Sequence, residues 1–128
     1  MEKVGLIGQV KTKVFAAQAA GCGPIVTAIK QGIDVIKPVK PNTIAKSLAI
    51  GNPADGFYAI QVVKESGGFG EDVSDNEIIE SIKLLARTEG IFAETAGGVT
   101  LAAAIKLIKE GSIDRDSLTV ICITGNGL

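Results

Sequence analysis

Short apolar runs and longer apolar patterns with helical spacing follow one another along the chain. Runs of four to eight β-branched or aliphatic residues favour strands, whereas apolar positions repeating every three or four residues favour helices. The expected strands cover residues 13–20, 57–64, 91–93 and 118–123, with a short strand-like or extended piece at 33–39. The last of these strands ends abruptly in a Thr-Gly-Asn-Gly turn at residues 124–127.

Four helices are expected between these runs. Pro24 favours the first turn of a helix over residues 24–30, and Asn42 or Thr43 can cap a second helix that ends at residues 51–53. Ser74 and Glu77 have the spacing of a capping box, so the third helix begins there and runs to about residue 87, before Gly90. The fourth covers residues 99–110, and its near-continuous apolar positions predict burial on more than one side.

Alternating strands and helices predict an α/β fold. We expect a mostly parallel sheet of about four strands with helices on both faces, which makes three layers. The first 13 residues have weak periodicity and are expected to form a short helix end or a loop that carries Val4, Leu6 and Ile7 inward.

Composition narrows the class of protein. A chain of 128 residues fits one domain, and the formal charge of −1 gives no sign of a nucleic-acid or acidic-membrane partner. The longest uncharged run, residues 14–29, is too short and irregular to span a bilayer, and no signal peptide is apparent. Cys22 and Cys122 are far apart in apolar surroundings, so both are expected to be structural thiols in a reducing cytoplasm.

Several kinds of chemistry are excluded by the residues. The chain has no histidine, so a Ser-His-Asp or Cys-His arrangement is impossible and no zinc site is plausible. The glycine clusters match neither the phosphate-binding loop with Gly-Lys-Ser/Thr nor the dinucleotide-binding pattern.

Four glycine-containing loops remain, each expected at the carboxyl end of a strand. Ligands of open α/β sheets bind at these ends. The loops cover residues 21–24, 66–70, 94–98 and 124–127. For the first two, a sharp turn is explanation enough. Glu94 could orient a bound group, or Glu94 or Thr95 could simply cap the following helix. The Thr124 hydroxyl could contact a ligand or bond its own turn.

Taken together, the segments resemble the carboxyl-terminal part of threonine synthase, a pyridoxal-phosphate enzyme of the tryptophan-synthase-β type. The resemblance covers essentially the whole chain. It is carried by residues 15–26 (FAAQAAGCGPIV), 43–45 (TIA), 50–53 (IGNP), 65–68 (ESGG), 73–77 (VSDNE), 89–98 (EGIFAETAGG) and 124–128 (TGNGL). It implies the large-domain fold of that family and the conversion of O-phospho-L-homoserine and water to L-threonine and phosphate.

The resemblance also implies roles for three residues. In the family, the threonine of the Thr-Gly-x-Gly-Leu motif hydrogen-bonds the cofactor's pyridine nitrogen, and the matching residues here are Thr124 and Gly125. The acid that follows the third expected strand matches Glu94, in a segment that many relatives write with proline where this chain has Thr95. Pyridoxal phosphate is therefore the expected cofactor of the complete enzyme, with no metal.

The same resemblance implies an incomplete site. The family's Schiff-base lysine and phosphate-cradling loop lie in its amino-terminal half, to which no segment here corresponds. Residues 1–128 are thus expected to be a partial enzyme domain, inactive alone, whose partner is the amino-terminal portion or a second copy in a dimer. The alternative is a non-catalytic module that self-associates or senses a small molecule.

Overall fold

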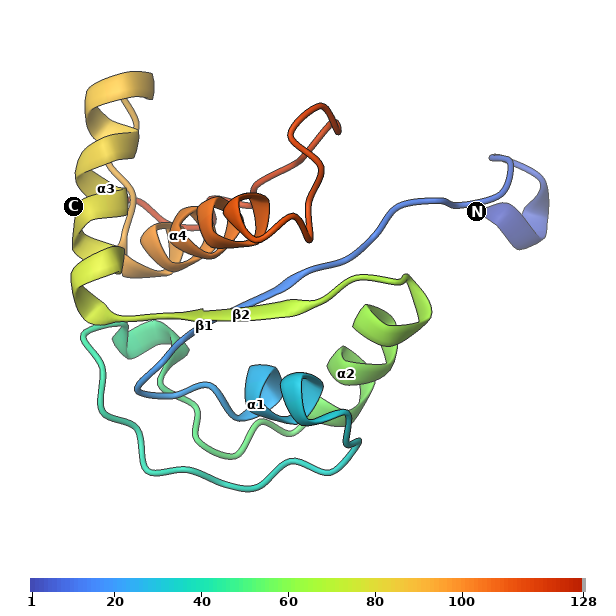
Figure 1. The fold of residues 1–128 in the computed structure, drawn as a ribbon, viewed down its shortest axis with the longest axis horizontal. Coiled ribbons are helices and arrows are strands. Elements are labelled where there is room, and N and C mark those ends of the chain that lie inside the picture. The colour runs from blue at the N-terminus through green and yellow to red at the C-terminus, as the bar shows by residue number, and fades with distance from the viewer. Residues whose placement is uncertain (128) are drawn as a thin grey trace.

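The computed structural model describes residues 1–127, with Leu128 outside the described part. Two strands and four α-helices form the body, and two short 3-10 helices lie in the loops (Figure 1). In chain order they are η1 (Glu2–Val4), β1 (Ala16–Ala19), α1 (Pro24–Gln31), η2 (Lys46–Leu48), α2 (Gly56–Glu65), β2 (Gly70–Val73), α3 (Asp75–Glu89) and α4 (Thr95–Lys109).

The sheet consists of β1 and β2, which run parallel. Ala16 pairs with Gly70 and Ala19 with Val73. The α/β class with parallel strands is therefore confirmed, but the described residues form two strands rather than about four.

Helices cover both faces of the sheet, as the sequence predicted. Figure 1 shows α3 and α4 on one side of the strands and α1 and α2 on the other. One apolar cluster joins the sheet to α3 and α4; its buried members are Ala19, Ala45, Val73, Ile78, Val99, Ala102 and Ala103. The second joins the sheet to α1 and α2 through Ala28, Ile29, Ile60 and Val63. The three layers thus share a small sheet as their centre.

On the first face, α3 begins and ends as expected, whereas α4 begins at Thr95 rather than at Val99, so residues 95–98 of the predicted loop 94–98 form its first turn. The Ser74 hydroxyl accepts the Glu77 N–H at 3.3 Å while the Glu77 carboxylate accepts the Ser74 N–H at 2.7 Å, which is the predicted capping box. Gly90 closes α3 with φ of 68°, a left-handed conformation that glycine adopts without strain. Helix α4 lies between α3 and the sheet, so its prediction of burial on more than one side is confirmed.

The predicted strand at residues 57–64 is wrong, because this segment is the helix α2. Its β-branched residues favour a strand by propensity, but Gly56, Ile60 and Val63 are the buried positions, with spacings of four and three. That spacing puts one apolar stripe against α1. Packing therefore overrides local propensity here.

The strand β2 was not predicted at all. Its four residues are Gly-Glu-Asp-Val, a polar sequence with neither alternation nor an apolar run. Gly70 faces α1, where an added Cβ would lie 3.2 Å from the Ile29 side chain, and Glu71 is held by lysines from two helices. Side-chain partners that are distant in sequence make this segment a strand.

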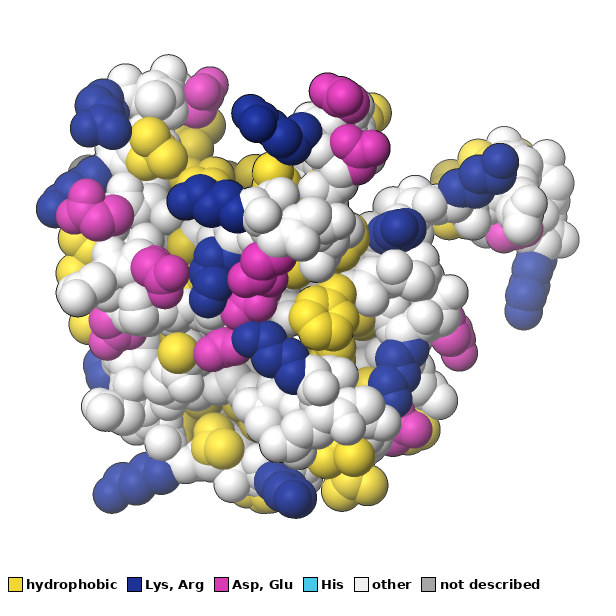
Figure 2. All heavy atoms as spheres, in the orientation of Figure 1, with side chains coloured by type: hydrophobic (Ala, Val, Ile, Leu, Met, Phe, Trp, Pro, Cys, Tyr) yellow, Lys and Arg dark blue, Asp and Glu magenta, His cyan; other side chains and the backbone are white. Residues whose placement is uncertain are grey.

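Other expected elements are shorter or absent. The helix expected after Thr43 is only the 3-10 turn η2, and residues 33–39, 91–93 and 118–123 form no strand. Residues 4, 6 and 7 are exposed, contrary to the expectation that they point inward, and Figures 1 and 2 show the amino-terminal segment extending away from the body. Within residues 1–127, no helix has the length and apolar character needed to cross a membrane.

Candidate functional site

The terminal turn is held against the start of α4. The Glu94 N–H donates to the Gly125 carbonyl at 3.1 Å, and the Gly127 N–H donates to the Phe92 carbonyl at 2.9 Å. Between these bonds, Ala93 and Asn126 form an isolated antiparallel bridge. The structure therefore brings the predicted loop 124–127 against residues 94–98, although residues 95–98 are the first turn of α4 and not a loop.

Contact between Glu94 and Gly125 is too close for any side chain at residue 125. A Cβ there would lie 2.2 Å from the Glu94 Oε1 and 2.4 Å from its Cδ. Glu94 is the residue that precedes α4, but its side chain makes no capping hydrogen bond, and Thr95 lies within the helix. The carboxylate thus lies over the terminal turn instead of capping the helix.

A second contact fixes the turn from the other side. The Ile123 side chain lies over Gly97, where an added Cβ would come within 3.2 Å of the Ile123 Cγ2. The next glycine, Gly98, allows α4 to approach α3, because a Cβ there would lie 2.8 Å from the Ile78 carbonyl oxygen. Gly97 therefore leaves room for the terminal segment, and Gly98 allows α3 and α4 to pack closely.

Thr124 lies between these two contacts, and its side chain is exposed. Among the described residues no hydrogen bond engages its hydroxyl, so the alternative that it bonds its own turn is not what the structure shows. An anchored residue with a free hydroxyl is able to donate to a ligand that approaches from outside.

The remaining two predicted loops lie apart from each other. Residues 21–24 follow β1, as expected. Residues 66–70 instead lead into β2, which begins at Gly70, and so belong to the opposite end of the sheet. The side chain of Gln18, a residue of β1, reaches the first turn of α1. Its Oε1 accepts the N–H groups of Ile25 and Val26, each at 2.9 Å. The N–H groups of Ile25 and Val26 at the start of α1 therefore already have a hydrogen-bond acceptor within the protein.

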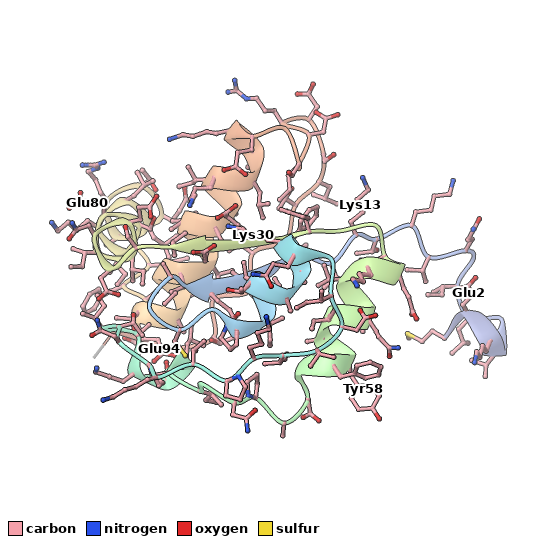
Figure 3. The ribbon with its side chains drawn as sticks, turned by 60° about the horizontal axis from the view of Figure 1, so that its bottom comes forward. Glu2, Lys13, Lys30, Tyr58, Glu80 and Glu94 are labelled. Carbon is pink, nitrogen blue, oxygen red and sulfur yellow. The ribbon has the colours of Figure 1, made fainter. Side chains whose placement is uncertain are left out.

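A charged cluster that the sequence did not predict lies where α1, β2 and α4 meet. The carboxylate of Glu71, only 5% exposed, accepts Lys30 at 2.7 Å and Lys106 at 3.1 Å, and Lys30 also pairs with Asp72. Figure 2 shows opposite charges gathered across this face, and Figure 3 shows Lys30 beside β2 and Glu94 at the start of α4.

The cluster favours the charged forms of both Glu71 and Lys30. Burial opposes the charged form of Glu71, but hydrogen bonds from Lys30 and Lys106 and from the Asp72 N–H outweigh it and hold its pKa below the usual value. Burial alone would lower the pKa of Lys30, but Asp72 and Glu71 raise it. No sequence signal identified the cluster, because it depends on the unpredicted strand β2.

The two cysteines differ in environment. Cys22 is buried, and burial raises the pKa of its thiol, whereas Cys122 is exposed, which corrects the expectation of apolar surroundings for both. No group of three or more histidine, cysteine or acidic residues suited to a metal occurs in the described part of the chain.

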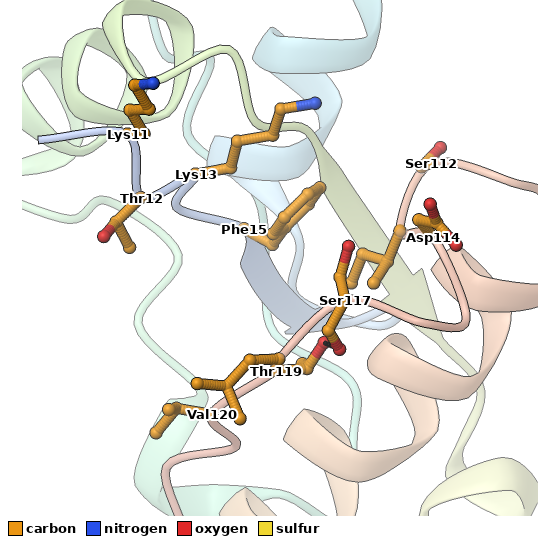
Figure 4. A pocket seen from close by; sticks show the side chains of 11 residues that line it. Lys11, Thr12, Lys13, Phe15, Ser112, Asp114, Ser117, Thr119 and Val120 are labelled. Carbon is orange, nitrogen blue, oxygen red and sulfur yellow. Dashed lines mark hydrogen bonds between the residues drawn. The ribbon is translucent and has the colours of Figure 1, made fainter.

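A cavity lies away from Glu94, between the segment that leads into β1 and the segment that follows α4. It has a volume of about 440 Å³. Figure 4 shows Lys13 and Phe15 on one side and Ser117, Thr119 and Val120 on the other. A smaller cavity of about 70 Å³ continues along β1 above α4.

The sequence of this chain matches a known protein family along almost its whole length. Residues 3–125 match the model of the family described as pyridoxal-phosphate dependent enzyme, and this chain belongs to that family.

Curated relatives of the chain are named threonine synthase. The protein of Methanocaldococcus jannaschii is 44% identical over 99% of this chain, and that of Methanosarcina acetivorans is 45% identical over 88%. The threonine synthase of Mycobacterium tuberculosis is 36% identical over 98%. The chain spans about a third of the length of these relatives: 31%, 28% and 33% respectively.

Solved structures share the fold. Maize serine racemase superposes with a TM-score of 0.73 at 22% identity, covering 91% of this chain and 36% of that one. Serine racemase from Dictyostelium discoideum gives a TM-score of 0.67 at 26% identity, with 91% and 35% covered. The expected α/β fold of a pyridoxal-phosphate enzyme is therefore confirmed.

Proposed function

We propose that this chain is the carboxyl-terminal portion of a threonine synthase, which converts O-phospho-L-homoserine and water to L-threonine and phosphate. The similarity to curated threonine synthases along nearly the whole chain supports this proposal. The observation that carries it is the anchored Thr124, whose unengaged hydroxyl projects from a turn fixed by Glu94 and Gly125.

Within that enzyme, Thr124 holds pyridoxal phosphate by its pyridine nitrogen. The residues fit this task, because the hydroxyl is a neutral donor with no competing bond and Gly125 leaves the turn without a side chain. A neutral donor leaves the nitrogen unprotonated, which restrains the cofactor as an electron sink and suits replacement chemistry over transamination. Glu94 acts as a positioning residue through its contact with Gly125.

The rest of the site lies in the part of the enzyme that this chain does not match. We assign the Schiff-base lysine and the loop around the cofactor phosphate to that part, so residues 1–128 are a partial domain that is inactive alone. The amino-terminal portion is the proposed partner, in the cytoplasm, where the free Cys22 and Cys122 remain reduced.

A second candidate, self-association without catalysis, is favoured by the number of apolar side chains left exposed, among them Leu118 and Val120. Sedimentation of the isolated chain separates the two. A tight symmetric dimer would support self-association, and a monomer would support the need for the rest of the enzyme.

A chimera tests the function directly. The matched third of Methanocaldococcus jannaschii threonine synthase is replaced by this chain, and threonine formation and pyridoxal phosphate affinity are measured. Thr124→Ala should weaken cofactor binding by about 2- to 10-fold, the worth of one hydrogen bond, while Thr124→Ser retains it. Thr88→Ala, in which an exposed α3 hydroxyl is lost, is the matched control.

Two outcomes would contradict the proposal. One is a folded chimera that forms no threonine, and the other is a Thr124→Ala variant that binds and uses the cofactor as well as the Thr88→Ala control.

A further inference from the structure

The main-chain groups at the middle of the outer edge of β2 already have partners. The Phe69 and Val73 carbonyls accept N–H groups from the β1 side of the sheet. Asp72 alternates with them, so its own main-chain groups point away from β1. The Asp72 N–H donates to the Glu71 Oε1 at 2.9 Å, and the Asp72 carbonyl accepts Lys106 Nζ at 2.8 Å. Charged side chains therefore occupy both groups that a further strand would need.

These side chains close around the edge from both faces of the sheet. Glu71 is in register with Ala17, which packs against the apolar cluster of α3 and α4, so both side chains point to the α4 face. Lys106 comes from that face. Lys30 comes from α1 on the other face and still reaches the Glu71 Oε1 at 2.7 Å, and Figure 3 shows it beside β2. The two lysines thus meet at one carboxylate, across the path of an incoming strand.

Stability alone gives little reason for this arrangement. Glu71 is 5% exposed, and a buried ion pair is often replaced by apolar side chains without loss of stability. An apolar side chain at residue 71 has no acceptor for the Asp72 N–H, and one at residue 106 has no donor for the Asp72 carbonyl. Occupation of the strand edge is thus the task for which these polar side chains are needed.

The covered edge is complementary to itself. In an antiparallel pair of strands, two directly opposite residues exchange both main-chain hydrogen bonds. Asp72 carries the donor and the acceptor, so Asp72 of one copy can pair with Asp72 of a second copy about a two-fold axis. Each copy also keeps Lys30 beside Asp72, which balances the two carboxylates that would face each other. The partner that fits this edge is therefore a second copy of the chain.

We propose that Glu71 and Lys106 form a β2 guard, which prevents the chain from pairing with a second copy through β2. With the guard in place neither bond of the Asp72 pair forms, because the donor and the acceptor of each copy are occupied. Without it, two sheets join edge to edge. Charged side chains at exposed strand edges prevent association of this kind in natural β-sheet proteins. The guard goes beyond the proposed function, since it does not depend on which reaction the enzyme catalyses.

Sedimentation of the Methanocaldococcus jannaschii chimera without substrate tests the guard. Glu71→Ala combined with Lys106→Met frees both Asp72 groups and removes one charge of each sign, so the net charge is unchanged. The double variant should form a larger species as its concentration rises from about 10 μM to about 1 mM, because a pair of four-residue strands is a small interface. Each single variant should sediment like the parent chimera, since one Asp72 group stays occupied.

Two control variants separate edge pairing from other causes of association. Glu80→Ala combined with Lys83→Met removes an exposed ion pair of α3 with the same change in charge. Gly98→Ala crowds the contact between α3 and α4 and leaves the guard intact. Neither control should associate. Asp72→Pro added to the double variant should restore the sedimentation of the parent, because proline has no N–H to donate to a second copy.

Glu71→Thr with Lys106→Met is a second double variant, because threonine favours strands where alanine does not. Circular dichroism checks that each variant is folded. The proposal is overturned if the folded double variants sediment like the parent at every concentration, if a control or a single variant associates equally, or if Asp72→Pro leaves the association unchanged. A chimera that forms no threonine but associates as described would refute the proposed function and support the guard.

Discussion

Replacing Glu71 with alanine removes the acceptor that two lysines from different helices share. Glu71 is 5% exposed, whereas Lys30 and Lys106 are 36% and 32% exposed. Breaking a fully buried ion pair costs about 3–5 kcal/mol, because a charge remains buried without a partner. Here both lysines can turn toward water, so we expect a smaller loss of about 2 kcal/mol. For a domain of this size this corresponds to roughly 8 °C in Tm.

The dependence of Tm on pH tests whether the charge of Glu71 causes this stabilisation. Because the folded state holds the pKa of Glu71 below the usual 4.5, ionised Glu71 stabilises the fold above that pH. The contribution is lost as the pH falls from 4.5 through the lower folded value. Wild-type protein should therefore lose Tm more steeply over this interval than Glu71→Gln, which keeps an acceptor for the Asp72 N–H but has no charge to titrate.

Thermal unfolding followed by circular dichroism at pH 7 and at several pH values below 4.5 measures both effects. The control is Glu80→Ala, which removes the exposed pair with Lys83 and should leave the Tm unchanged. The reasoning would be refuted if Glu71→Ala melted like wild type, or if Glu71→Gln kept the wild-type pH dependence.

Two further predictions concern packing and accessibility. Gly98→Ala places a Cβ 2.8 Å from the Ile78 carbonyl, so it should lower the free energy of unfolding by about 1–2 kcal/mol in urea titrations. Gly8→Ala has no neighbour within 4 Å, and an equal loss there would contradict this explanation. Cys122 should react rapidly with a thiol reagent, while buried Cys22, whose pKa is raised, should react only on unfolding. Equal rates in the native protein would contradict the assigned environments.

Elements defined by local signals were predicted correctly. The helix α3 has a capping box at Ser74 and a terminal Gly90, and both signals act over a few residues. Helix α1 likewise begins at Pro24 and ends before Gly32. Such elements need no distant partner to fix their ends, so the sequence was sufficient.

Elements that depend on partners distant in the sequence were not predicted correctly. Residues 57–64 have strand propensity but become α2, because their apolar stripe is buried by α1. The polar strand β2 depends on Lys30 and Lys106, which lie 41 and 35 residues away from Glu71. Neither outcome is encoded in a short window of sequence.

At the candidate site, the sequence supplied the residue types and the structure supplied their proximity. The pattern at residues 124–127 predicted a terminal turn with a hydroxyl, and the role of Thr124 as a cofactor partner stays a prediction. The approach of Glu94 to Gly125 came only from the fold, since residues 31 positions apart meet through the bridge between Ala93 and Asn126.

By itself, the sequence determined the α/β class, the family resemblance, the ends of α1 and α3, and the presence of an apolar terminal run before Thr124. The tertiary structure alone decided that this run, at residues 118–123, pairs with no strand of the described chain and faces a groove beside β1. The physical reason is that a strand is completed by hydrogen bonds from its neighbours. A segment can carry every local mark of a strand and still depend on residues elsewhere to become one.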